Sequence, residues 1–319
     1  MGIGYLFNVI KPSLNVSRGD IGGVDLWRLL LLALTSRLLV FMVAVVSNWF
    51  IGLRISEVEE LYNIDIPFLY LFARWDSAYY MNIAKHWYFL GREHWAFPPL
   101  FPVVLRVCSY PLCSFLYVDQ ALVVSGFFAN NFLFLLAVAI FYRFTLRLFD
   151  DERMAFLSAL FLCLYPGGLF FSAVYSESLF MALMLASLYS LELGRWWRAG
   201  FFASLASLTK SIGFLLFIPL LFRAVQEAKR GGGLDAASST AWLAPIFTYL
   251  AWTLYGYLMT GDLNLYQHVQ AEYWGVGLHD PITAFMSIPP PTRLLIAPAI
   301  IVSALSILVF LAEGGVRLW

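Results

Sequence analysis

The sequence predicts an all-α, polytopic membrane protein built as a bundle of about eight transmembrane helices. Of its 319 residues, 61% are hydrophobic and only 13% are charged, and the mean hydropathy is +0.77. Soluble domains usually contain about 25% charged residues, so this chain lacks the polar side chains that would cover a water-exposed surface. Its apolar runs have the length of bilayer-crossing helices, about 17 to 25 residues, and no open sheet can cross the hydrocarbon. The runs are 26–50, 98–117, 121–142, 154–172, 177–194, 199–222, 241–260 and 293–312.

The domain organisation follows from the charges between these runs. We expect a single integral membrane domain, 1–319, with a cytoplasmic N-terminal segment, 1–25, and two outer loops, 51–97 and 261–292. The first loop has six acidic and four basic residues, and the second has three acidic residues and neither Lys nor Arg. Because basic residues favour the cytoplasmic side, both loops are expected to face away from the cytoplasm.

Eight straight crossings do not fit this orientation, since they would place the basic links 143–153 and 195–198 on the outer side. Consistency returns if the region 98–149 contains an additional crossing or half-crossing. The run 199–222 would then be a broken or re-entrant helix, as Lys210 within it also indicates.

The overall charge and the cysteines exclude several classes of partner. The formal net charge is zero, so no general field attracts nucleic acid. Cys108, Cys113 and Cys163 form no CxxC pair, and His268 and His279 have no companions at metal-ligand spacing. We therefore expect no nucleic-acid partner and no cofactor, with a divalent metal neither indicated nor excluded.

The stretch "LFARWDSAYYMNIAKHWY", residues 71–88, places an ionisable pair beside an apolar region. It predicts a helix from about Ser77 to Phe89 that lies in the membrane interface, with its aromatic face toward the lipid. That face consists of Tyr80, Ile83, Ala84 and Trp87. Asp76, just before this helix, has two interpretations that are compatible: an N-cap that accepts bonds from the next amides, or a catalytic carboxylate kept ionised by the helix terminus.

The stretch "REHWAFPPLFP", residues 92–102, follows this helix. Its Glu93 and His94 could assist acid–base chemistry or contact a phosphate. The alternative is a solvated loop tip. The prolines are expected to reshape the backbone where the chain re-enters the membrane.

The stretch "LYPGGLFFSAVYSESLF", residues 164–180, places polar residues at the start of a span. Tyr175 and Glu177 are candidates for binding sugar hydroxyls. In the alternative interpretation Ser176 caps the helix and Glu177 interacts with the helix dipole.

Lys210, in "LASLTKSIGFLLF", lies near the centre of an apolar run. A lysine there costs about 2.5–3.5 kcal/mol on insertion scales. Either it reaches the interface because the helix breaks at Gly213, or it faces a polar cavity and an anion such as a lipid phosphate. We favour a functional role.

The stretch "YQHVQAEYWGVGL", residues 266–278, is rich in aromatic residues. Trp274 or Tyr273 could stack on a sugar, or could simply anchor the loop at the interface.

Together these stretches resemble the PIG-V mannosyltransferase family of GPI-anchor synthesis and its prokaryotic relatives. "RWDSAYYMNIAKHWY" resembles the first-loop motif, "EHWAFPPLFP" the Phe-Pro-x-Phe-Pro element and "FFSAVYSESLF" the Tyr-Ser-Glu element. "LTKSIG" stands where the family has Arg-Ser-Asn-Gly, and "QAEYWGVGL" where it has Tyr-Trp-Asn-Val-Gly. The similarity extends from about residue 70 to 300, with the motifs in the family's order.

The resemblance implies a GT-C-type bundle and an inverting hexosyltransferase that acts on the non-cytoplasmic face. The implied donor is dolichyl- or polyprenyl-phosphate mannose, and the acceptor is a glycolipid or lipid-linked glycan held among membrane lipids. Asp76 would be the catalytic base. The substrate-binding residues would be Arg74, Trp75, His94, Tyr175, Glu177, Lys210, Gln270 and Trp274.

The chain departs from the family pattern at several positions. Lys210 replaces an arginine, which keeps the charge but loses the bidentate fork. Ile212 and Gly275 each replace an asparagine, and "YPGG", 165–168, replaces Asn/Ser-Pro-Ala. The chain also ends at Trp319, where the family usually continues with further helices. These differences bear on the acceptor and on the completeness of the enzyme.

Two other classes stay open from the residues alone. Charged residues in spans and broken helices also serve transporters and flippases of lipid-linked sugars, although no interrupted helices occur in matching halves. The short segment after the last run also fits a non-catalytic subunit of a mannosyltransferase complex. The brevity of the chain favours a prokaryotic cell membrane, or the endoplasmic reticulum membrane if the source is a eukaryote.

Overall fold

The computed structural model describes residues 23–51, 68–229 and 235–277, with single positions 283, 285, 286, 288 and 290. Everything described in these ranges as regular structure is helical, which confirms the all-α prediction. The chain forms two compact units, Met1–Tyr266 and Gln267–Trp319, and each is described by itself. The predicted span 293–312, the segment 1–22 and part of the first outer loop, 52–67, lie outside the described residues.

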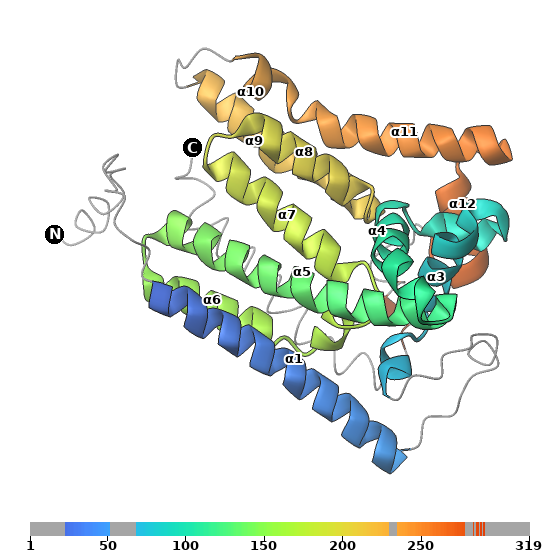
Figure 1. Cartoon of the computed structure of the whole chain (residues 1–319). Helices are drawn as coiled ribbons and strands as arrows, with labels where there is room; N and C mark the ends of the chain where they lie inside the picture. The colour runs from blue at the N-terminus through green and yellow to red at the C-terminus, as the bar shows by residue number, and fades with distance from the viewer. Residues whose placement is uncertain are drawn as a thin grey trace. The chain divides into compact units, whose positions relative to one another are not determined.

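The first unit is a row of packed helices (Figure 1). Helices α1 and α6 border α5, which packs against α7, and α8 and α11 follow on the far side of α7. The bounds are α1 Gly23–Ile51, α3 Ser77–His86, α4 Leu100–Ser109, α5 Val118–Phe149, α6 Glu152–Cys163, α7 Glu177–Glu192, α8 Trp196–Ser207, α9 Phe217–Lys229, α10 Ala236–Thr240 and α11 Leu243–Thr260. The short helix α12, Leu265–Trp274, begins in this unit and continues into the second.

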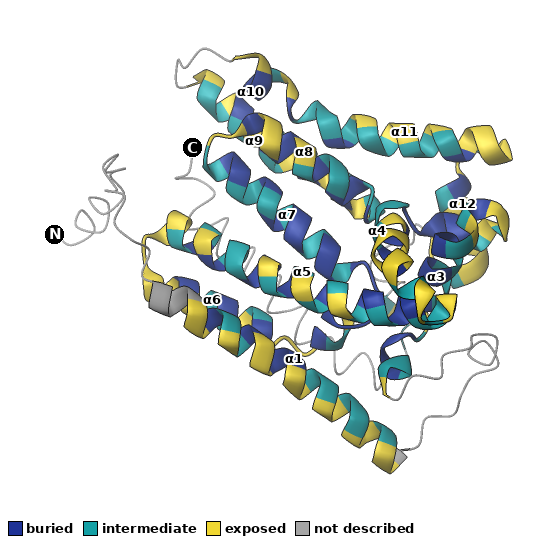
Figure 2. Cartoon of the chain, in the orientation of Figure 1, coloured by how far each residue is buried: buried dark blue, intermediate teal, exposed yellow. Residues whose placement is uncertain are grey.

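Three described helical stretches are long and apolar enough to cross a membrane, namely Trp27–Phe50, Val118–Phe149 and Ser211–Lys229. One side of α1 is exposed along the helix (Figure 2), and apolar residues lie there, with Leu38 and Met42 more than half accessible. Such a large apolar surface is expected where lipid covers the protein.

Two of the predicted spans, besides 199–222, are not single helices. In the run 98–117, α4 has only ten residues, about 15 Å of helix, and continues as the 3-10 helix η5, Tyr110–Ser114. This length fits the predicted half-crossing rather than a full span of about 30 Å. In the run 154–172, α6 ends at Cys163 and is followed by irregular chain and the 3-10 helix η6, Gly168–Phe171.

The early end of α6 has a local cause. Pro166 disfavours helical backbone at the residue before it, and Gly167 and Gly168 follow. Arg37 of α1 then binds the exposed carbonyls: its Nη1 donates to Gly168 O at 2.6 Å and its Nη2 to Cys163 O at 3.4 Å. The prediction of a continuous span over 154–172 was therefore wrong. Hydropathy could not reveal this break, because the residues around it are apolar and Arg37 binds the carbonyls that the break leaves outside a helix.

The predicted break within 199–222 is confirmed. Helix α8 ends at Ser207, Lys210 has extended backbone with φ −143° and ψ 138°, and the 3-10 helix η7, Ser211–Leu216, follows. The two ends pass very close to each other, since a Cβ on Gly213 would lie 2.4 Å from the carbonyl carbon of Ala206. Only glycine fits at position 213, because any side chain would overlap the backbone of Ala206 and Ser207.

Helix α3 forms close to its predicted range, followed by the 3-10 helix η3, Trp87–Phe89. Its predicted lipid-facing side is instead inside the protein: Tyr80, Ile83 and Ala84 are 4%, 1% and 9% exposed. Tyr80 packs its ring against Phe97 and Phe101, each at 5.0 Å between centroids. The expectation that this face lies on lipid was wrong because α4 covers it.

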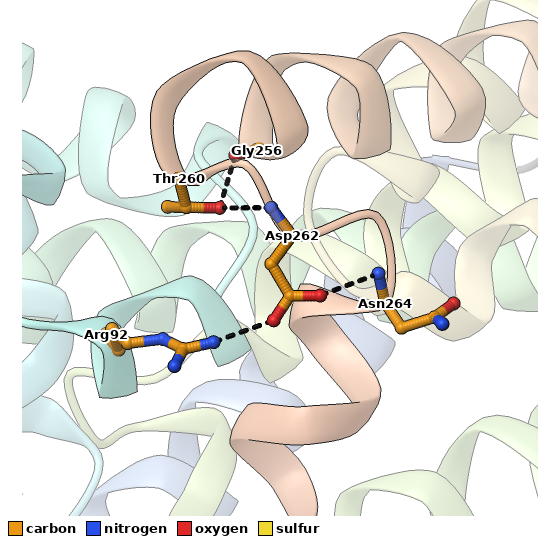
Figure 3. A network of polar contacts seen from close by, with 5 residues as sticks. All are labelled: Arg92, Gly256, Thr260, Asp262 and Asn264. Carbon is orange, nitrogen blue, oxygen red and sulfur yellow. Dashed lines mark hydrogen bonds and ion pairs between the residues drawn. The ribbon is translucent and has the colours of Figure 1, made fainter.

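The loop after α3 is docked on α11. Arg92 Nη2, in the 3-10 helix η4, Arg92–Ala96, pairs with Asp262 Oδ2 at 2.7 Å, and Asp262 Oδ1 accepts from Asn264 N at 3.0 Å (Figure 3). Beside this pair the ring of Trp95 stacks on that of Trp252, with centroids 5.4 Å apart. The segment that contains Arg92 and Trp95 is thereby fixed to α11 and the turn after it.

Candidate functional site

The site is assembled from two loops that meet through backbone hydrogen bonds. Val174 N donates to Phe72 O at 2.8 Å, so the segment before α3 and the segment before α7 run side by side. Asp76 N donates to Tyr175 Oη at 3.2 Å. These two bonds bring together motifs that are almost 100 residues apart in the chain.

Asp76 occupies the N-cap position of α3, yet its side chain makes no capping hydrogen bond. The capping interpretation of this residue is therefore wrong, and the carboxylate is left for other contacts. It is partly exposed. Burial raises the pKa of Asp76, the nearby Glu177 carboxylate raises it further, and the Lys210 ammonium lowers it. Asp76 is thus a stronger base than a freely solvated aspartate.

Glu177 and Lys210 form an ion pair in which Lys210 Nζ lies 2.7 Å from Glu177 Oε1. Their side chains are 27% and 32% exposed. The sequence predicted an anion for Lys210, and the partner in the protein is this carboxylate. The other oxygen, Glu177 Oε2, is buried and accepts no hydrogen bond from any residue that the structure describes. The charges of both residues act on the pKa of Asp76, which Glu177 raises and Lys210 lowers.

Tyr80 and Tyr175 contact the residues around Asp76 from within the protein. Tyr80 Oη lies 2.8 Å from Ser176 Oγ, so Ser176 bonds across to α3 and makes no capping bond to its own helix. This contradicts the capping interpretation of Ser176. Burial raises the pKa of both Tyr80 and Tyr175, which keeps both hydroxyls protonated at neutral pH. Sequence reasoning missed Tyr80 and Ser176 as a pair, because either one is ordinary by itself.

Arg74 and Trp75 lie at a small hollow next to this cluster, with room for about one water molecule. Both line it together with Tyr175, and the other walls are apolar, including Leu71 and Phe170. Trp75 is 70% exposed and has a φ of 49°, in the left-handed region that favours glycine. An aromatic residue kept in this conformation beside a pocket is the kind of strain that accompanies binding sites.

His94 is inside the protein rather than on a solvated tip. It is 3% exposed, its ring lies edge-on to Tyr79 at 5.6 Å, and its Nδ1 is 3.2 Å from Glu93 Oε1. Burial lowers the pKa of His94, against the smaller opposite effect of Glu93. None of the hydrogen bonds found among the described residues connects His94 to Asp76.

Gln270 and Trp274 lie on the part of α12 that belongs to the second unit. Gln270 O accepts a hydrogen bond from Val276 N at 3.0 Å, and the Trp274 ring packs on Tyr273 at 6.0 Å. Their predicted contact with substrate stays a prediction.

Three polar residues that sequence reasoning missed hold the loop before α7. They are Arg37 of α1 and the adjacent Asn130 and Asn131 of α5, which contact backbone or Ser172 in that loop. A signal was present, because ionisable and amide side chains inside membrane spans are uncommon and usually have a specific partner.

In the described parts of the chain, no group of three or more His, Cys, Asp or Glu side chains is arranged to hold a metal ion. The site offers a carboxylate base beside a carboxylate–ammonium pair and two neutral phenols. Such a set can accept a proton and offset negative charge on a departing group.

Comparison with known proteins agrees with the motifs. A family model described as Mannosyltransferase (PIG-V) matches residues 26–228. GPI alpha-1,6-mannosyltransferase 2 of Rattus norvegicus is 28% identical over 254 residues, covering 65% of this chain and 51% of the relative. GPI mannosyltransferase 2 of Yarrowia lipolytica is 26% identical over 224 residues, covering 66% and 59%. The Cricetulus griseus GPI alpha-1,6-mannosyltransferase 2 is 34% identical over 152 residues, covering 45% and 31%.

The chain thus matches between 31% and 59% of the length of these relatives. No solved structure gives a significant match. The family match, in contrast, extends over more than half of the 319 residues and includes Asp76, Tyr175, Glu177 and Lys210. This integral membrane chain belongs to the Mannosyltransferase (PIG-V) family.

Proposed function

We propose that the chain is a catalytic membrane mannosyltransferase. It would transfer mannose from dolichyl- or polyprenyl-phosphate mannose to a glycolipid or lipid-linked glycan on the non-cytoplasmic face. Membership of the family supports the mannosyl chemistry, and the relatives' names refer to GPI mannosyltransferases. The acidic outer loops support the choice of face.

The observation that carries this proposal is the uncapped carboxylate of Asp76. Aspartates at helix N-termini normally accept backbone hydrogen bonds, as Asp151 does from Arg153 N and Met154 N. Asp76 directly precedes α3 but has helical backbone, with φ −60° and ψ −18°, and its side chain makes no such bond. A partly exposed, strengthened base beside a pocket is the group that an attacking hydroxyl requires.

In the proposed reaction, the acceptor hydroxyl gives its proton to Asp76 while its oxygen attacks the anomeric carbon of mannose. The bond from that carbon to the phosphate oxygen breaks, the lipid phosphate leaves with the electron pair, and the anomeric configuration inverts. Lys210 offsets the charge that develops on the phosphate, with Arg74 as a second cation. Base assistance of this type is typically worth about 10²- to 10⁴-fold in rate.

The remaining residues would define the substrate pocket. Trp75 and Tyr175 line the pocket and would contact the sugar. Glu177, whose side chain is 27% exposed, would bind a sugar hydroxyl. His94, Gln270 and Trp274 remain candidates for binding the donor.

The test is transfer of labelled mannose from a polyprenyl-phosphate donor by the purified chain in detergent. We expect Asp76→Asn to lower kcat by about 10²- to 10⁴-fold, since the amide keeps the shape but cannot accept the proton. Asp150→Asn is the matched control, because Asp150 is exposed and has a φ of 51° that asparagine tolerates.

Undiminished turnover in Asp76→Asn would remove Asp76 from the mechanism. Exchange of lipid-linked sugar across vesicles without a new glycosidic bond would identify a transporter instead. Transfer that occurs only after a second protein is added would identify a subunit of a complex.

A further inference from the structure

Asn130 is a fully buried polar residue near the middle of the long helix α5. Its Nδ2 donates hydrogen bonds to two carbonyls of the loop before α7, Ala173 O and Tyr175 O, the second at 2.9 Å. Both carbonyls belong to chain outside any helix and therefore lack a partner within a helical hydrogen-bond ladder. Ala173 O also accepts from Tyr175 N at 2.8 Å, so the amide adds a second hydrogen bond to Ala173 O and supplies one to Tyr175 O, in backbone that lies inside the bundle.

The orientation of this amide is determined by its surroundings. Reversing it would place Oδ1 against two carbonyl oxygens, so only the amino group can face them. Oδ1 then accepts no hydrogen bond from the described residues, although it is buried. A buried acceptor without a donor lowers stability. The two hydrogen bonds from Nδ2 to the loop are therefore the contacts that account for asparagine at this position.

The loop held by Asn130 is the one that carries Tyr175. Between the two bound carbonyls, Val174 N donates to Phe72 O at 2.8 Å, and Tyr175 Oη accepts from Asp76 N at 3.2 Å. A shift of this loop would therefore move the backbone at Asp76. We infer that Asn130 is a positioning residue for mannosyl transfer, which acts through the 173–175 backbone on Tyr175 and Asp76. This inference rests on the proposed function.

The next residue on the helix provides a matched control. Asn131 Oδ1 accepts from Ser172 Oγ at 2.9 Å, and its Nδ2 donates to Phe127 O of its own helix at 2.7 Å. The loop contact of Asn130 thus needs donors, whereas that of Asn131 needs an acceptor. Substitution by aspartate removes the two amide N–H donors and keeps an acceptor at either position. Even a protonated aspartate at 130 has one O–H donor, so one of the two loop hydrogen bonds is lost.

We expect Asn130→Asp to lower kcat by about 10²-fold, the cost of misplacing a reacting group by about 1 Å, with the KM for the donor unchanged. Asn131→Asp should keep the wild-type kcat. Asn130→Ala removes the donors without adding a charge and should lower kcat in the same way. Equal losses in the two aspartate variants would overturn the inference, since charge at that depth would then be the cause.

A double-mutant cycle separates positioning from a general structural role. In a Tyr175→Phe background, Asn130→Asp should cost less in kcat than it does in the wild type, because part of its effect passes through the Tyr175 hydroxyl. An equal cost in both backgrounds would overturn this route. Thermal midpoints of all variants in detergent establish that they are folded.

Hydrogen–deuterium exchange gives a readout that does not depend on activity. Peptides covering 71–77 and 172–176 should exchange faster in Asn130→Asp and at the wild-type rate in Asn131→Asp. Unchanged exchange in Asn130→Asp would overturn the inference even if the chain transfers mannose. A wild-type chain without transfer activity would overturn the proposed function, and the exchange data would still decide whether Asn130 holds the loop.

Discussion

Three aspartates at helix N-termini show how differently one residue type can be used in this chain. Asp151 and Asp235 each accept backbone hydrogen bonds from the first turn of the following helix. For the exposed Asp235 these bonds lower the carboxyl pKa. Asp76 makes no such bond, and its pKa is raised by burial and by Glu177. Position at a helix terminus therefore does not decide the role of the carboxylate; its contacts do.

The pH dependence of transfer should depend on the charges around Asp76. The reaction requires the ionised form, so the rate falls as the pH drops through the pKa of Asp76. Glu177→Gln removes a negative charge, makes ionisation easier and should move the acidic limb of kcat/KM to lower pH. Lys210→Met removes a positive charge and should move that limb to higher pH.

Lys85→Met is the control for this pH experiment. Lys85 belongs to a separate ion pair, with Asp119 Oδ1 at 2.7 Å, so its removal should leave the limb in place. Shifts of the same sign in Glu177→Gln and Lys210→Met would contradict the assignment of Asp76 as the titrating base.

At the level of single residues, the sequence predicted charged groups better than their partners. Asp76 and Lys210 stood out in the sequence because an ionisable residue in apolar surroundings is conspicuous, and their roles in catalysis stay predictions. The pairing of Lys210 with Glu177 was not, since it depends on how α7 and α8 pack. Asn130 was missed because a single amide hardly changes the hydropathy of a long apolar run.

At the level of elements, the breaks in the helices matter more than their number. The chain leaves helical geometry after Cys163 and after Ser207, and each break delivers a site residue, Tyr175 and Lys210 respectively. Hydropathy predicted the second break, where a lysine marks it. It did not predict the first, where the freed carbonyls are bound by Arg37 and Asn130.

Gly213→Ala should disrupt the second break. The added Cβ would lie 2.4 Å from Ala206 C and 2.6 Å from Ser207 N, so α8 and η7 must separate. Overpacking of this kind typically costs about 1–3 kcal/mol, and we expect a lower thermal midpoint together with reduced transfer as Lys210 moves.

Ile212→Ala is the neighbouring control for Gly213→Ala, since Ile212 is 58% exposed and should tolerate truncation. A wild-type midpoint in Gly213→Ala would show that the two chain segments can separate without cost.

At the level of the whole molecule, the fold class and the family followed from composition and motif order. The covering of α3 by α4, in contrast, could not be predicted, because an aromatic helix face has the same pattern against lipid as against protein. The docking of the 92–96 segment on α11 could not be predicted either. It joins Trp95 to Trp252 and Arg92 to Asp262, which lie far apart in the sequence.

This docking should depend on aromatic packing more than on charge. Trp95 is 5% exposed, and Trp95→Ala should lower the free energy of unfolding by about 3–5 kcal/mol. Arg92 is 49% exposed in its ion pair, so Arg92→Gln should cost about 0–1 kcal/mol. Denaturant unfolding in detergent compares the two, and an equal loss would contradict this ranking.

The pairing of Glu177 with Lys210 also has a consequence for synthesis of the chain. The base and its neighbouring acid are translated 134 and 33 residues before the cation. Until the ribosome has passed Lys210, the nascent protein holds a glutamate in the bilayer region without the lysine that accompanies it in the finished fold. The ion pair of the candidate site can therefore form only after the segment that follows α8 has been made.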